Sequence, residues 1–196
     1  VVLPVPAYMP FFDVLHLTGR RGVFVPMLRE ADGYAFDLTA IEAAFAAGAG
    51  SVILCNPYNP LGAVFSVAQL RALTDLAASY DALVIADEIH APLRYEGAHV
   101  PAASVSAAAA EVTLTLVASS KGWNTPGLKC AQVITSNPRH QRAWTRMHRL
   151  RGHGASTIGI EASIASYEHG EPWLESLLAY LRGNRDYLAA ALPQVA

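Results

Sequence analysis

The chain has 196 residues, of which 53% are hydrophobic and 15% are charged, so it carries enough apolar material for one globular core. Its formal net charge of −2 gives no electrostatic basis for binding nucleic acid or an acidic membrane surface. The sequence contains no run of about 18 apolar residues and no signal-peptide pattern. We therefore expect no membrane span and a cytoplasmic location.

Short apolar runs alternate along the chain with amphipathic segments, which is the pattern of an α/β fold with a largely parallel sheet. The predicted strands cover residues 1–3, 23–26, 51–55, 82–86, 112–117 and 130–135. The predicted helices cover residues 8–17, 37–47, 66–80, 139–150, 157–169 and 173–192. Ser66 and Gln69 form a capping-box pattern, which places the start of the third helix.

The two cysteines, Cys55 and Cys130, are too few for a disulfide framework. Both lie in apolar runs with strand character, so we expect buried free thiols that serve packing. Three histidines, His140, His148 and His153, could indicate a metal site. Their spacing does not place them on one helical face and no acidic or cysteine cluster joins them, so we predict no metal.

The first chemical motif contains Lys121, one of the two lysines in the chain, just after the apolar run 112–117. It lies between small hydroxyl residues and a loop with glycine and proline. A lysine held in such a cleft can lose solvent, lower its pKa and form an imine with an aldehyde. The alternative is an ordinary surface lysine in a turn.

The second motif is the sequence Asn-Pro-Tyr-Asn-Pro-Leu-Gly at residues 56–62, which follows the predicted strand 51–55. Ligands in open α/β sheets bind outside the carboxyl ends of the strands, where this loop lies. Pro57 and Pro60 stiffen the loop around Asn59, and the amide of Asn59 can donate to a phenolate oxygen. The alternative is that these residues simply form a turn.

The third motif is Asp-Glu-Ile-His at residues 87–90, after a wholly apolar predicted strand. An unpaired carboxylate on Asp87 would be costly to bury there, so a positive group must meet it. From the residues alone, an arginine could be this partner, or the carboxylate could act as a helix N-cap. His90 gains interest as a site residue only from its spacing to Asp87.

In this order, the three motifs resemble those of fold-type I pyridoxal phosphate (PLP) enzymes of aminotransferase class I/II. Within that group they look closest to the MalY/PatB branch of cystathionine β-lyases, or C–S lyases. The resemblance implies a three-layer α/β/α sandwich with a mainly parallel seven-stranded sheet. Residues 1–196 would be the PLP-binding large domain, and the N-terminal segment and the C-terminal small domain of the family would be absent.

The resemblance also implies roles for single residues. Lys121 would be the catalytic residue that holds the cofactor through its amine. The cofactor-binding set would be Tyr8, stacked on the pyridine ring; Asn59 and His90, near the 3-oxygen; Asp87, on the ring nitrogen; and Ser119, Ser120 and Lys129, on the phosphate. The chain departs from the family at Ala118, a common serine position, and at Lys129, a common arginine position. For Tyr8, a core aromatic at a loop–helix junction is the alternative.

The activity that the resemblance implies is β-elimination from L-cystathionine or related cysteine S-conjugates, which yields a thiol, pyruvate and ammonia. The first alternative is a class I/II aminotransferase, which uses the same residues. The second is a non-catalytic PLP-binding sensor module or an inactive truncation. The implied partners are a small amino-acid substrate and a second copy of the chain in a homodimer.

Overall fold

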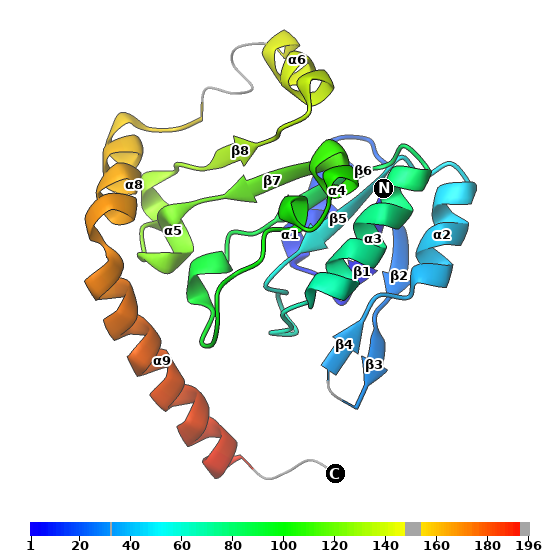
Figure 1. Cartoon of the computed structure of the whole chain (residues 1–196). Helices are drawn as coiled ribbons and strands as arrows, with labels where there is room; N and C mark the ends of the chain where they lie inside the picture. Colours follow the sequence, from blue (N-terminus) through cyan, green and yellow to red (C-terminus); the bar gives the residue numbers. More distant parts are fainter. Residues whose placement is uncertain (32, 148–153, 193–196) are drawn as a thin grey trace.

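The computed structural model describes residues 1–31, 33–147 and 154–192 (Figure 1). At its centre is a six-stranded sheet in the order β2-β1-β5-β6-β7-β8. The first five strands of this order run parallel and β8 runs antiparallel to β7. The strands are β1 (Val2–Val5), β2 (Val23–Pro26), β5 (Ser51–Cys55), β6 (Leu83–Asp87), β7 (Thr113–Val117) and β8 (Gln132–Ile134).

This sheet confirms the predicted α/β class and the positions of the predicted strands to within a few residues. The number of strands differs from the resemblance, because the described residues place six strands in the sheet and not seven. The two further strands, β3 (Leu28–Glu30) and β4 (Gly33–Ala35), pair only with each other in a hairpin. This hairpin was not predicted, because its strands are three residues long and bury no side chain fully.

The strands alternate their side chains between two cores, which gives the three layers. Val52 and Leu54 of β5 face the core beneath α2 (Leu38–Ala46), α3 (Val67–Ser79) and α4 (Ala107–Val112). Ile53, between them, faces the opposite core with Leu15 of α1 (Met9–Leu17). Because side chains of a strand point to alternate faces, a continuous apolar run such as that of β5 serves both cores. Figure 1 shows α2, α3 and α4 on one face of the sheet and α1 behind it.

The remaining helices lie beyond β7 in the chain. They are α5 (Ser119–Gly122), α6 (Pro138–Arg146), α8 (Thr157–His169) and α9 (Glu171–Ala191). Three short 3-10 helices complete the elements: η1 (Ala91–Leu93) and η2 (Ala102–Ser104) precede β7, and η3 (Pro126–Leu128) follows it. The predicted helices 157–169 and 173–192 correspond to α8 and α9. The predicted helix 139–150 corresponds to α6, and its last three residues lie outside the described part. None of the described helices has the length and apolar character needed to cross a membrane.

The sheet topology brings the three sequence motifs to one edge. The chain goes from β1 outward to β2 and later returns to place β5 on the other side of β1, so strand order reverses there. Beyond that point Cys55 of β5 pairs with Asp87 of β6, and Asp87 pairs with Leu116 of β7. The carboxyl ends of these three parallel strands therefore lie at one level, which is where open α/β sheets bind ligands.

The capping box that begins α3 provides a test of the local sequence signals. The backbone amide of Gln69 donates to Ser66 Oγ at 3.2 Å, and the amide of Ser66 donates to Gln69 Oε1 at 2.9 Å. We expect Ser66→Ala to lower the free energy of unfolding by about 1 kcal/mol, measured by urea denaturation, because one helix-end amide loses its acceptor. Ser79→Ala, at the other end of the same helix, should leave it unchanged. Equal effects of the two substitutions would contradict this account.

Candidate functional site

The Asn-Pro loop (residues 56–62) leaves β5 as a tightly bonded turn. Asn56 is buried, and its amide extends the sheet by donating to the carbonyl of Asp87 at 3.0 Å. The amide of Gly62 donates to the carbonyl of Tyr58 at 2.7 Å, and the Tyr58 hydroxyl donates to the carbonyl of Pro4 at 2.7 Å. These bonds fix the loop on both sides of Asn59, so its amide side chain is held at the strand end.

The side chain of Cys55 contacts the backbone of the same loop. It is a buried free thiol, as predicted, and its Sγ lies 3.5 Å from the amide of Asn59 and 3.3 Å from the carbonyl of Pro57. Burial raises the pKa of the thiol to about 11, and the Asn59 amide only partly offsets this. The sulfur is therefore a neutral thiol near pH 7 and acts in packing.

Asp87 is the acidic group of the site. Burial raises the pKa of its carboxyl, and the neighbouring Glu88 adds to this; the Ile89 amide, His90 and Lys121 act in the opposite direction. The amide of Ile89 donates to Asp87 Oδ1 at 3.1 Å. Within the described residues no cation lies within ion-pair distance of Asp87. The half-buried carboxylate thus has the surroundings expected of a group that meets a cation on a ligand.

His90 is the second titratable group, three residues beyond Asp87. Burial lowers the pKa of its imidazole; Lys121 also lowers it, whereas Asp87 and the Pro57 carbonyl raise it. A lowered pKa means that the ring is neutral near pH 7, so one ring nitrogen carries a hydrogen and can donate. His90 and Asn59 line the same cleft, so both can donate to one ligand oxygen.

Lys121 lies on α5, at the carboxyl end of β7, and is exposed. The expected position just after a strand is confirmed, and residues 119–122 form one helical turn there. Its ammonium is close enough to contribute to the pKa of both Asp87 and His90, so the three groups share one space. The structure thereby brings together the central residues of all three motifs.

The other predicted site residues differ in how far their side chains are exposed. Tyr8 is 42% exposed at the start of α1 and touches Phe11 edge-on at 5.7 Å between ring centroids, so it is not a core aromatic.

Ser119 is buried, and its Oγ lies 3.0 Å from Ser163 Oγ on α8. Ser120 is half-buried, and Lys129 is exposed in a left-handed conformation with φ of 50°. Their phosphate contacts stay predictions, and Ser120 is the better exposed of the two serines.

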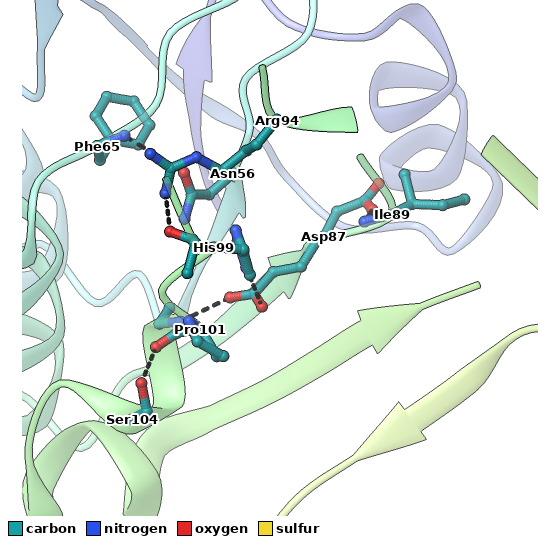
Figure 2. A network of polar contacts seen from close by, with 11 residues as sticks. Asn56, Phe65, Asp87, Ile89, Arg94, His99, Pro101 and Ser104 are labelled. Carbon is teal, nitrogen blue, oxygen red and sulfur yellow. Dashed lines mark hydrogen bonds and ion pairs between the residues drawn. The ribbon is translucent and has the colours of Figure 1, made fainter. Parts of the chain in front are cut away.

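Glu88 is a residue of the site region that the sequence analysis did not assign. Its side chain is 2% exposed; Oε1 accepts from the amide of Ala102 at 2.7 Å, and Oε2 lies 2.8 Å from His99 Nε2. Figure 2 shows His99 and Pro101 on one side of this network and Asp87 directed away toward Ile89. Its place in the Asp-Glu-Ile-His motif could have drawn attention to Glu88. Its hydrogen-bond partners could not have been predicted, because they lie 11 and 14 residues away in the sequence.

Comparison with known proteins identifies the family of the chain. The family model for aminotransferase class I and II matches residues 1–195. The chain belongs to this family. A cystathionine β-lyase of Corynebacterium glutamicum is 47% identical over 195 residues, which are 100% of this chain and 51% of that protein. Protein MalY of Escherichia coli is 33% identical, and its match covers 100% of this chain and 51% of MalY.

Solved structures of this family have the same fold. A putative PLP-dependent β-cystathionase from Corynebacterium diphtheriae superimposes with a TM-score of 0.88 at 48% identity, covering 95% of this chain and 48% of that one. The PLP-bound C–S lyase from Staphylococcus hominis gives a TM-score of 0.90 at 27% identity, covering 98% and 49%. The chain spans about half the length of the curated relatives it matches. Relatives named as aminotransferases also match, at 28% identity.

The metal prediction concerns three histidines, of which His148 and His153 lie outside the described residues. His140 lies on α6, with Nδ1 3.4 Å from Thr135 Oγ1. In residues 1–31, 33–147 and 154–192, no group of three potential metal ligands is found.

The buried Glu88 carboxylate should be a main contributor to the stability of the site region. We expect Glu88→Ala to lower the free energy of unfolding by about 3 kcal/mol, because the buried Ala102 amide and the His99 ring lose their partner. Urea denaturation of the cofactor-free chain measures this. Glu96→Ala removes a carboxylate that is 85% exposed and should have little effect. A loss no larger than that of Glu96→Ala would show that the network contributes nothing.

Asp87 should have the opposite effect on stability. Its native pKa is raised, so the ionised form is disfavoured in the folded state, and this cost is present above the native pKa. We expect Asp87→Asn to raise the free energy of unfolding of the cofactor-free chain at pH 7, since the amide keeps an acceptor for Ile89 and carries no charge. The advantage should shrink as the pH falls and Asp87 itself takes up a proton.

The measurement is urea denaturation between pH 7 and pH 4, with Asp13→Asn, an exposed carboxylate on α1, as the control. An Asp87→Asn chain that is less stable than the parent at pH 7 would contradict the assignment of an unneutralised carboxylate.

Proposed function

We propose that the whole protein is a PLP-dependent C–S β-lyase that cleaves L-cystathionine or related cysteine S-conjugates to a thiol, pyruvate and ammonia. The observation that carries the proposal is the meeting of Asn59, Asp87, His90 and Lys121 at the ends of three parallel strands. The 47% identical relative named as a cystathionine β-lyase supports the reaction class. In this proposal residues 1–196 are the PLP-binding large domain, and the protein acts as a cytoplasmic homodimer.

The residues present fit PLP by their chemistry. Asp87 is a half-buried carboxylate with no cationic partner in the described chain, and would pair with the protonated ring nitrogen. His90 and Asn59 would donate to the 3-oxygen, and the exposed ring of Tyr8 would stack on the pyridine. Ser120, Lys129 and, less accessibly, Ser119 would contact the phosphate. Lys121 would hold the aldehyde carbon through its Nζ.

When bound, PLP supplies an electron sink for the electron pair that remains on the substrate Cα after its proton leaves. Once the substrate amine has displaced it, the Lys121 amine would be the base that takes this proton, because it lies close enough to affect the pKa of both Asp87 and His90. An ionised Asp87 would stabilise positive charge on the ring nitrogen. The C–S bond at Cβ would then break, the sulfur would depart with the bonding electrons as a thiolate, and water would hydrolyse the remaining unsaturated amine to pyruvate and ammonia. Neutral His90 would donate a hydrogen bond to the 3-oxygen without adding charge.

His90 favours this reaction over transamination. Many class I aminotransferases carry a tyrosine at this position, and the MalY/PatB branch, which this chain resembles, carries a histidine. An aminotransferase is nevertheless the second candidate, because relatives with that name match at 28% identity and the same residues would serve it.

The deciding experiment measures pyruvate release from L-cystathionine by the whole protein with PLP and without any keto acid. Sustained pyruvate formation supports the β-lyase. Turnover that begins only when a keto acid is supplied would identify an aminotransferase. Absence of both reactions, together with retained PLP binding, would identify a sensor module.

Lys121 can be tested independently of the substrate. We expect borohydride reduction of the PLP-loaded protein to attach the cofactor to Lys121 and not to Lys129, the other lysine of the chain. Peptide mass mapping shows the site of attachment. Lys121→Ala should abolish attachment and lower pyruvate formation at least about a thousandfold, because a positioned proton-transfer group is lost. Lys129→Ala should keep the attachment, and cofactor found on Lys129 in the parent would refute the assignment.

A further inference from the structure

A cleft of about 690 Å³ extends from the cofactor-facing residues toward α9. Its lining includes Asn59 and His90, together with residues 93–96 and Arg185 of α9. The cleft therefore joins two residues proposed to contact PLP to a group of charged side chains. In the proposed reaction the leaving thiol is attached to Cβ of the substrate, so its remaining atoms need a space adjoining the cofactor.

The two arginines of the cleft differ in how they are neutralised. Arg185 has Asp186 at 2.8 Å and Glu96 at 3.8 Å, and its guanidinium lies 5.3 Å from the centre of the Tyr95 ring. Arg94 is half-buried and donates through Nη1 to the carbonyl of Ala98, a neutral acceptor. Across the described ranges it has no carboxylate within ion-pair distance, so its charge is available to a ligand.

A guanidinium of this kind selects for a carboxylate. Its planar fork gives two parallel hydrogen bonds to a carboxylate, and the bond to Ala98 fixes its orientation beforehand. Partial burial strengthens the attraction, since less water competes for the charge. Glu96, in the same cleft, offers an exposed carboxylate that can attract an ammonium group. Arg94 and Glu96 together thus match the charges of an amino acid.

We infer that Arg94 binds the carboxylate at the leaving-group end of a cysteine S-conjugate, as in the homocysteine half of L-cystathionine. The inference rests on the proposed β-lyase function and deepens it by naming the preferred substrate class. Arg94 is then a specificity-determining residue. Conjugates with a carboxylate on the leaving thiol are favoured over those with a neutral alkyl group.

The test compares two substrates that share the same scissile bond, using the whole protein loaded with PLP. L-Cystathionine carries the distal carboxylate, and S-ethyl-L-cysteine does not. For Arg94→Gln we expect kcat/KM with L-cystathionine to fall about 10- to 100-fold, which is the loss of a charge-assisted hydrogen bond pair. The value with S-ethyl-L-cysteine should stay unchanged. Arg94→Lys should be intermediate, since it keeps the charge but not the fork.

Two further substrates show whether Arg94 recognises a carboxylate or any charged group on the leaving thiol. S-(2-carboxyethyl)-L-cysteine should lose as much as L-cystathionine in Arg94→Gln, and S-(2-aminoethyl)-L-cysteine should lose nothing. Arg139→Gln is the matched control, because Arg139 is exposed and pairs with Asp81 away from the cleft. Equal losses on all substrates would show a structural role for Arg94, and no loss on any would show no contact. Either result overturns the inference.

Failure of the proposed function is distinguishable from failure of the subsite. If the parent protein releases no pyruvate from any of these substrates, the β-lyase assignment is wrong. The subsite is then tested by binding alone, with L-methionine, which reproduces the distal half of L-cystathionine with a methyl group on sulfur. Calorimetry on the cofactor-free protein should show binding that Arg94→Gln weakens about tenfold or more. Equal binding to both proteins, or none to the parent, overturns the inference.

Discussion

Backbone hydrogen bonds continue across β5, β6 and β7 beyond the strand ends, and the candidate site depends on them. The amide of Asn56 donates to the carbonyl of Asp87, and the amide of Glu88 donates to the carbonyl of Leu116. Three segments that are distant in the sequence therefore leave the sheet at the same level. Each then turns into a loop or a short helix with polar side chains. The register places the amide, the carboxylate and the amine in one space before any ligand arrives.

Asp87 and Glu88 show how adjacent acidic residues can serve opposite purposes. Successive side chains at a strand end point to opposite sides. Glu88 is buried, whereas Asp87 is half-buried and directed toward Ile89 (Figure 2). Glu88 has the Ala102 amide and His99 as partners and holds residues 99–102 against the sheet. Among the described residues Asp87 has one side-chain hydrogen-bond partner, the Ile89 amide, and burial raises the pKa of its carboxyl. Glu88 thus stabilises the region, whereas the Asp87 carboxylate is available to bind a ligand.

The local parts of this arrangement could be predicted. The capping box at Ser66, the apolar strands and the three motifs all depend on residues within a few positions of one another, and these are the interactions that periodicity and spacing report. The β3–β4 hairpin was missed, since such short and partly exposed strands leave no periodic pattern. The phosphate contact of Ser119, implied by the resemblance, stays a prediction. Its hydrogen-bond partner could not be predicted, because Ser163 on α8 is 44 residues away.

The sequence alone determined the α/β class, the resemblance to aminotransferase class I/II, and the chemical groups at the strand ends. Those conclusions follow from side-chain chemistry and from the hydrophobic pattern, which are local properties. Only the tertiary structure decided that Glu88 is buried with His99. It also decided that, among the described residues, no cation lies within ion-pair distance of Asp87 and no carboxylate lies within ion-pair distance of Arg94, which lines the cleft. Burial and neutralisation depend on which distant residues the fold brings near, and no spacing along the chain encodes them.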